Sequence, residues 1–100
     1  MTDRRVVRVS SDFFDQLDRQ LRPERGPSGE PSATDFIVVD LPTIVERFAA
    51  QFESLPEAVE GVPEARVVVG TGEVVRAFVV YGLLLTDGAV ELIGVDIDNP

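Results

Sequence analysis

The stretch ARVVVGTGEVVRAFVVYGLLLTDGAVELIGVDI, residues 65–97, decides the fold of this chain. Valine, leucine and isoleucine dominate it, and two breaks, Gly70-Thr71-Gly72 and Asp87-Gly88, are typical of turns between antiparallel strands. The pattern therefore predicts a β-meander whose strands span 66–69, 74–85 and 90–97.

The middle strand of this meander, 74–85, is largely apolar on both faces, because side chains alternate along a strand. One face carries Val75, Ala77, Val79, Tyr81, Leu83 and Leu85, and the other carries Val74, Arg76, Phe78, Val80, Gly82 and Leu84. One layer of helices covers only one face, so we expect a second cover: the segment 36–41, a second copy of the chain or a helix of a partner. We assign the partner-binding surface to Val74, Phe78, Val80 and Leu84.

The first third of the chain predicts a strand, a helix and a loop. Residues 4–10 are valine-rich and predict the strand. Ser10 or Ser11 then caps a helix with the apolar stripe Phe13, Phe14, Leu17 and Leu21. Residues 23–34 (PERGPSGEPSAT) contain three prolines and two glycines, which predicts a mobile loop.

The segment after the loop is ambiguous, and the helix that follows it is clear. β-Branched residues favour an extended conformation for 36–39, whereas Thr34-Asp35 before it could cap a helix. Asp40 is the predicted cap of the next helix, with Pro42 in its first turn. Its apolar stripe is Ile44, Val45, Phe48, Ala49 and Phe52, and the helix should end near Leu55-Pro56.

These patterns together predict one α+β domain over residues 1–100. Two N-terminal helices pack on the C-terminal antiparallel β-meander, in the order β-α-α-β-β-β. A hydrophobic content of 44% is typical of a packed core in a chain of this length. No apolar run approaches the roughly 18 residues of a membrane span, and the N-terminus lacks the apolar segment of a signal peptide. We therefore expect a cytoplasmic protein without membrane contact.

The residue types that the chain lacks limit the catalytic and metal-binding chemistry open to it. The chain has no cysteine and no histidine, and its nine basic residues are all arginine. This excludes thiolate and imidazole chemistry, Schiff-base lysines and a P-loop, so we expect neither a metal nor a cofactor. The net charge of −9 is uneven: residues 1–25 carry six arginines and five acids, and residues 26–100 carry three and thirteen. This distribution disfavours nucleic acid and favours a basic partner or a salt-rich cytoplasm.

The order of elements and the chain from Gly61 onward resemble the RelE/ParE superfamily of toxins from bacterial toxin–antitoxin pairs. Gly61-Val62-Pro63-Glu64 is similar to the turn into the family's second strand. VRAFVVY (75–81) is similar to the arginine-then-aromatic pattern of its third strand, and DGAVELIGVDI (87–97) to its final strand. The helices match only by their order.

This resemblance implies a type II toxin that a cognate antitoxin neutralises, acting through ribosome-dependent mRNA cleavage or on DNA gyrase. An enzymatically active member would be a metal-independent RNA endonuclease. Arg76 would then hold the phosphate, Arg66 would be a second phosphate contact, and Tyr81 would assist the attacking hydroxyl. The acidic end of the last strand, Asp96-Ile97-Asp98, opposes phosphate binding and therefore disfavours ribosome, mRNA and cleavage.

Each of these three residues also has a structural interpretation. Arg76 would form an ion pair with Glu91 or another acid, Arg66 would be an exposed strand-end residue, and Tyr81 would belong to the core. Two further functions stay open. One is a catalytically silent, acidic interaction module that forms a homodimer through the sheet face. The other is an acidic inhibitor that mimics nucleic acid.

Overall fold

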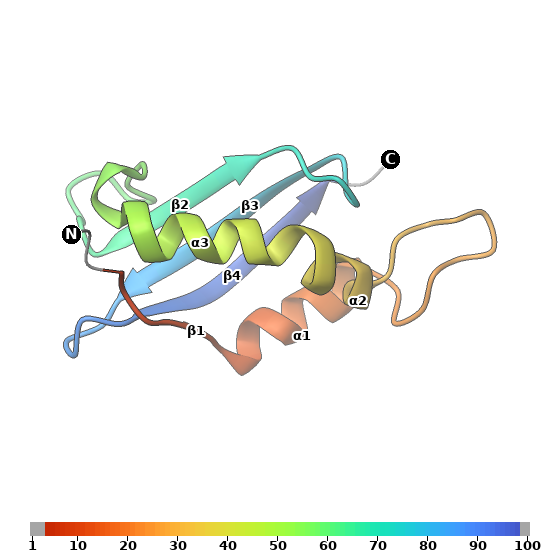
Figure 1. The fold of residues 1–100 in the computed structure, drawn as a ribbon, viewed down its shortest axis with the longest axis horizontal. Helices are drawn as coiled ribbons and strands as arrows, with labels where there is room; N and C mark the ends of the chain where they lie inside the picture. Colours follow the sequence, from red (N-terminus) through yellow and green to blue (C-terminus); the bar gives the residue numbers. More distant parts are fainter. Residues whose placement is uncertain (1–3, 99–100) are drawn as a thin grey trace.

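The computed structural model describes residues 4–98, in which helices lie against a four-stranded sheet (Figure 1). The strands are β1 (Val7–Val9), β2 (Ala65–Gly70), β3 (Ala77–Leu84) and β4 (Val90–Asp98). Their order in the sheet is β1-β4-β3-β2; β2, β3 and β4 pair antiparallel, and β1 pairs parallel to β4. The predicted α+β class and the β-meander are confirmed, and β4 lies between β1 and β3.

Helix α1 (Ser11–Gln20) starts where the sequence predicted and packs on β4. The Ser10 side chain caps it by accepting a hydrogen bond from the Phe13 N–H. Phe13 and Leu17 are completely buried, because they occupy the helix face turned toward the core. Phe14, which the sequence analysis placed in the same stripe, is instead 38% exposed.

Two glutamines of α1 hydrogen-bond the main chain of β4 beyond the short strand β1. The Gln16 amide donates to the Ile93 carbonyl (3.1 Å) and accepts from the Val95 N–H (3.1 Å). One turn later, the Gln20 amide donates to the Val95 carbonyl (2.7 Å) and accepts from the Ile97 N–H (2.6 Å). These side chains make the hydrogen bonds that a longer β1 would make.

The ambiguous segment 36–39 is helical, so its extended alternative is wrong. Helix α2 (Ala33–Asp35), π-helix η1 (Phe36–Asp40), helix α3 (Leu41–Gln51) and the 3₁₀ turn η2 (Phe52–Ser54) follow one another without a break. Within residues 4–98, no helix is long and apolar enough to cross a membrane.

The cap of this helical run is Ser32. Its hydroxyl accepts from the Asp35 N–H, and the Asp35 carboxylate accepts from the Ser32 N–H, both at 3.0 Å. This reciprocal pair ends the loop before α2, which is why the loop stops short of the predicted residue 34. The loop itself extends away from the sheet (Figure 1). Arg25 ties it back to α2 through two hydrogen bonds to Asp35, at 3.0 and 3.2 Å.

The contribution of Asp35 and its hydrogen bonds to stability should depend on pH. Hydrogen bonds from Arg25, then those from Ser32, lower the pKa of Asp35 to about 2 from 3.8. A lowered pKa in the folded state means that the Asp35 carboxylate stabilises the fold above pH 3.8, and that this contribution is lost as the pH falls toward about 2. Urea unfolding should therefore show Asp35→Asn less stable than the wild type at pH 5 to 6, with the two converging near pH 2. The control is Asp18→Asn, because Asp18 is exposed on α1; a constant gap for Asp35→Asn across this range contradicts the prediction.

Asp40 caps no helix, contrary to the prediction. Its carboxylate is buried, 6% exposed, and accepts hydrogen bonds from the N–H groups of Glu73 (2.7 Å) and Val74 (3.0 Å). The loop between β2 and β3 is thereby fixed to the start of α3. For this reason β3 begins at Ala77, and the predicted strand residues 74–76 belong to the loop.

The core lies between the helices and one face of the sheet. Phe48 of α3 is completely buried and lies directly over Gly82 of β3, where an added Cβ would come within 2.4 Å of the Phe48 ring. Val80 and Phe78 of β3 point to the same side, with exposures of 0% and 8%. Val74 and Leu84 are half-buried against this core. The partner-binding face predicted from the sequence is thus the face that the chain's own helices cover.

Candidate functional site

The opposite face of the sheet has no element of the described chain packed on it, and we call it the open face. The strand pairing places on it Ala65, Val67 and Val69 of β2, Ala77, Val79, Tyr81 and Leu83 of β3, and Glu91, Asp96 and Asp98 of β4. Val69 is 60% exposed, and Val79, Tyr81 and Leu83 are partly exposed, whereas Val67 is buried at 9% exposure. The sequence analysis expected both faces of the middle strand to be covered, and within residues 4–98 only one is.

Carboxylates from β4 border the apolar part of the open face. Asp96 lies opposite Val79, and Asp98 lies opposite Ala77, across the β3–β4 pairing. A hollow of about 180 Å³ lies at this end of the sheet, between Val69 and these acids. The surface therefore combines apolar side chains with negative charge.

Tyr81 lies on the open face rather than in the core. Its hydroxyl donates a hydrogen bond to the Asp96 carboxylate at 3.2 Å. Partial burial, and then the hydrogen bond to Asp96, raise the pKa of Tyr81 above its ordinary value of 10.0. A phenol with a raised pKa stays protonated at neutral pH and is a poor general base.

Arg76 is exposed in the loop just before β3, and its ion-pair partner is Asp98 rather than Glu91. Its guanidinium lies 3.9 Å from the Asp98 carboxylate. Glu91 lies opposite Leu83, toward the other end of β3, which separates it from Arg76. With a carboxylate as its neighbour, Arg76 is a weakened phosphate ligand.

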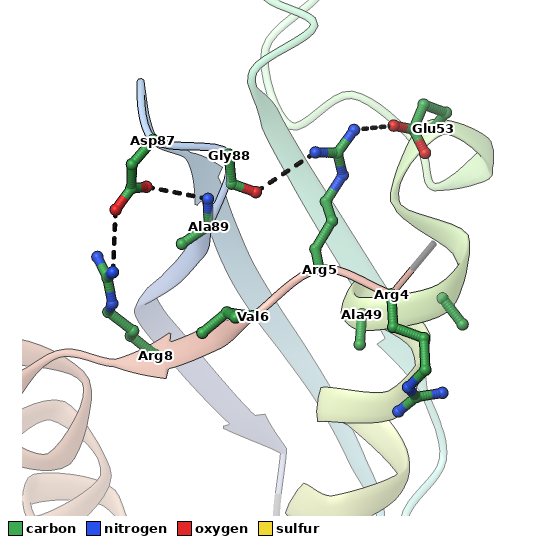
Figure 2. Close-up of a pocket in the computed structure, with 10 residues that line it drawn as sticks. Arg4, Arg5, Val6, Arg8, Ala49, Glu53, Asp87, Gly88 and Ala89 are labelled. Carbon is green, nitrogen blue, oxygen red and sulfur yellow. Dashed lines mark hydrogen bonds and ion pairs between the residues drawn. The ribbon is translucent and has the colours of Figure 1, made fainter. Parts of the chain in front are cut away.

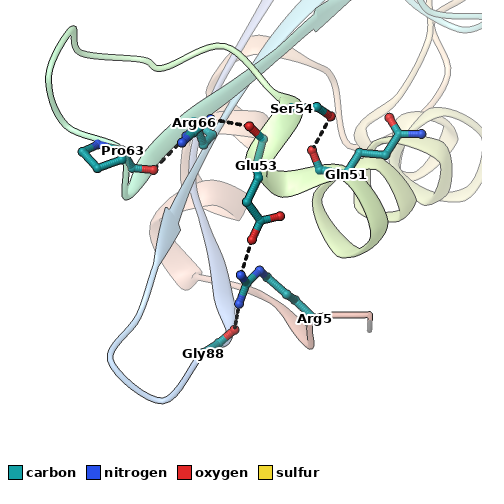
Figure 3. Close-up of polar contacts among 7 residues, drawn as sticks. All are labelled: Arg5, Gln51, Glu53, Ser54, Pro63, Arg66 and Gly88. Carbon is teal, nitrogen blue, oxygen red and sulfur yellow. Dashed lines mark hydrogen bonds and ion pairs between the residues drawn. The ribbon is translucent and has the colours of Figure 1, made fainter. Parts of the chain in front are cut away.

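Arg66 is held by the main chain of its own domain (Figure 3). Its guanidinium donates to the carbonyls of Pro63 (2.7 Å), Glu53 (3.0 Å) and Leu55 (2.7 Å). It also lies 5.4 Å from the centre of the Phe52 ring, a cation–π distance. These contacts join η2 to the start of β2, which is a structural role, and they leave Arg66 away from the open face.

The structural role of Arg66 predicts that its replacement lowers the stability of the fold. Arg66→Gln removes charge-assisted hydrogen bonds to carbonyl oxygens, so we expect the free energy of unfolding to fall by about 2 kcal/mol. Urea denaturation measures the loss, and Arg47→Gln is the matched control, since Arg47 forms no ion pair among residues 4–98. An Arg66→Gln protein as stable as the control would contradict the structural role.

The N-terminal arginines surround a cavity of about 560 Å³ beside β1 (Figure 2). Arg8 pairs with Asp87 at 2.9 Å, Arg4 pairs with Glu46, and Arg5 pairs with Glu53 and donates to the Gly88 carbonyl. Figure 2 shows the guanidinium groups of Arg4, Arg5 and Arg8 pointing in different directions. Within residues 4–98, Arg4, Arg5 and Arg8 are therefore divided among separate ion pairs and form no single anion site.

Hydrogen bonding lowers the pKa of each of these three carboxyl groups. The Arg4 guanidinium lowers the pKa of Glu46, the Arg5 guanidinium lowers that of Glu53, and the Ala89 N–H, followed by Arg8, lowers that of Asp87. The three acids therefore stay ionised and keep their arginines neutralised at neutral pH.

The three predicted catalytic residues do not form one site. Arg66 is bound to carbonyls beside η2, while Tyr81 and Arg76 each face an aspartate of β4. In the part of the chain that the structure describes, no group of acidic side chains is arranged to hold a metal ion. No family model, curated protein or solved structure matches this chain.

The sequence analysis missed the roles of Asp40, Gln16 and Gln20. The spacing of the two glutamines, one helical turn apart on α1, was a signal for a shared partner. For Asp40, the signal was weak, because an aspartate before a proline-containing helix start is also typical of an ordinary cap.

Proposed function

We propose that this chain is a RelE/ParE-like domain of a type II toxin–antitoxin pair that acts by binding a protein and has no RNA-cleaving site. The observation that carries the proposal is the arrangement of one strand, a helical layer and a three-stranded meander, β2-β3-β4, with one apolar sheet face left uncovered. An uncovered apolar face is typical of protein-binding surfaces. The antitoxin and the cellular target are the proteins that this function requires, and both would be met in the cytoplasm.

The contacts of the candidate catalytic residues support binding over RNA cleavage. Cleavage needs cations that converge on a phosphate and a base in reach of the 2′-hydroxyl. Arg66 is engaged by three carbonyls, Arg76 has Asp98 beside it, and the Tyr81 hydroxyl is bound to Asp96. A gyrase-type protein target therefore fits the domain better than mRNA on the ribosome.

Controlled expression in bacteria tests the proposal. Induction of the chain alone should slow growth, and co-expression of the adjacent gene should restore it. Purified protein should leave mRNA intact in a translation extract and should inhibit supercoiling by gyrase. Unchanged growth with and without the adjacent gene removes the toxin function, whereas mRNA cleavage by the purified protein contradicts the binding mechanism.

The homodimer hypothesis is favoured by the same apolar face. Phe78 and Leu84 lie on the helix side, so charged residues there would disrupt the core rather than an interface. Val79→Arg is the informative variant because Val79 lies on the open face. Sedimentation that shows a dimer in the wild type and a monomer in Val79→Arg would support a self-associating module.

A further inference from the structure

The open face has an apolar strip and an acidic margin that come from different strands. Val69 of β2, with Val79 and Leu83 of β3, supplies the strip. The margin consists only of β4 residues: Glu91, Asp96 and Asp98. The charge is thus concentrated along one side of the strip.

The arginines near this margin leave a surplus of carboxylates. Arg8 of β1, opposite Glu91, is paired with Asp87 at 2.9 Å. Arg76 forms a long ion pair with Asp98, at 3.9 Å. Arg19 of α1 lines a hollow together with Asp96 and a further acid, Asp12. A second copy of the chain would bring the same surplus of carboxylates, which is unfavourable when the two faces are desolvated together. Charge complementarity therefore points to a basic occupant.

The strand edges next to this face are largely occupied. The edge of β4 is covered by β1 and then by Gln16 and Gln20. The first half of the β2 edge is hydrogen-bonded to residues 56–58, through the Val67 N–H to Pro56 O (3.0 Å) and the Ala58 N–H to Ala65 O (2.8 Å). An occupant accordingly lies on the face and does not extend the sheet.

We infer that the open face binds a basic amphipathic helix of a partner protein. This deepens the proposed function, and it rests on that function for the presence of a protein partner. A helix buries one apolar stripe against a sheet, as α3 does on the other face. Asp96 and Asp98 are two strand residues apart, about 7 Å, and one helical turn rises 5.4 Å. Basic residues at i and i+4 of a helix lying along β4 would face both carboxylates.

The experiment uses two synthetic peptides of about 18 residues that share the same leucine stripe. One carries lysine and arginine beside the stripe at i, i+4 spacing, and the other carries glutamate at these positions. Fluorescence anisotropy with the full chain should show the basic peptide binding about tenfold or more tightly than the acidic one at about 0.05 M salt. This preference should shrink in about 1 M salt, where the screening length is about 3 Å.

Variants place the binding on the open face. Val79→Arg should abolish binding of the basic peptide. Val38→Arg should not, because Val38 is an equally apolar residue, 67% exposed, on the π-helix. The double change Asp96→Asn and Asp98→Asn should weaken binding about three- to tenfold while keeping an acceptor for Tyr81. Thermal melts confirm folding, and the double variant tests the inference even if Val79→Arg unfolds.

The outcomes separate this inference from the proposed function. Equal affinity for both peptides, no binding of either, or equal effects of Val79→Arg and Val38→Arg would overturn the docking surface. A wild-type dimer that Val79→Arg dissociates would assign the face to a second copy instead. Selective peptide binding by a chain that does not affect growth would keep the surface and remove the toxin function.

Discussion

Replacing Asp40 by alanine should lower the free energy of unfolding by about 3 kcal/mol. The Asp40 carboxylate is the acceptor for the N–H groups of Glu73 and Val74, and it is buried between α3 and the β2–β3 loop. Alanine leaves both donors without this partner, and charge-assisted hydrogen bonds are stronger than neutral ones. Because the same loop positions Val75 in the core, its release should also loosen the packing there.

A series of substitutions distinguishes the loss of the two hydrogen bonds to Asp40 from a general effect of charge. Asp40→Asn keeps one oxygen acceptor and loses the charge, so it should cost about half as much as Asp40→Ala. Asp18→Ala, at an exposed site on α1, should change stability by less than about 0.5 kcal/mol. Chemical denaturation measures all three, and amide exchange at Glu73 and Val74 should accelerate in the Asp40 variants. Unchanged amide exchange at Glu73 and Val74 would contradict the role of Asp40 in holding this loop.

Gly82→Ala should also cost about 3 kcal/mol, for a steric reason. An added Cβ at Gly82 would lie 2.4 Å from one carbon of the Phe48 ring and within 3.1 Å of two others. Phe48 is completely buried, so its ring has no room to move away. The strain should appear as a lower midpoint of thermal unfolding.

A double-mutant cycle tests whether the Phe48 ring causes this loss. Phe48→Leu shortens the side chain above Gly82 and should cost about 1 to 3 kcal/mol alone. Combined with Gly82→Ala, it should cost less than the two single changes added together, because leucine leaves space for the new methyl group. Additive losses would show that the contact between residues 48 and 82 is not the source of the strain.

Local patterns predicted much of the fold correctly. The turn at Asp87-Gly88 is present, with Gly88 at φ of 90°, and Ser10 caps the first helix as predicted. Both are decided by neighbouring residues: a glycine tolerates positive φ, and a serine hydroxyl reaches an N–H three residues on. The period-two pattern likewise identified β3 and β4 as strands.

Contacts distant in the sequence account for most of the errors. The start of β3 depends on Asp40, more than thirty residues earlier, which holds the loop and shortens the predicted strand. Residues 37–39 are β-branched, yet they are helical because Ser32 starts a helix that continues into α3. That signal is local, a capping pair with Asp35 that the sequence analysis missed, whereas the contact of Asp40 leaves no periodic signal in the sequence.

The candidate site was predicted least well. Alternation showed that the middle strand has two apolar faces, but it did not show which face the helices choose. Phe48 above Gly82 decides this, since the glycine makes room for the ring on that side. The partner surface was therefore assigned to Phe78 and Val80, on the side that the chain's own helices cover. Arg66 was likewise assigned to chemistry because its carbonyl partners become visible only in three dimensions.

The position of β4 between β1 and β3 has a consequence for synthesis on the ribosome. β4 is the last of the four strands to be made, although β1 and α1, made first, have it as their main sheet partner. A nascent chain must therefore keep its valine-rich beginning unpaired until β4 emerges. During that interval the hairpin β2-β3 exposes the very strand edge that β4 later occupies, so aggregation during translation should be greatest for chains arrested before residue 90.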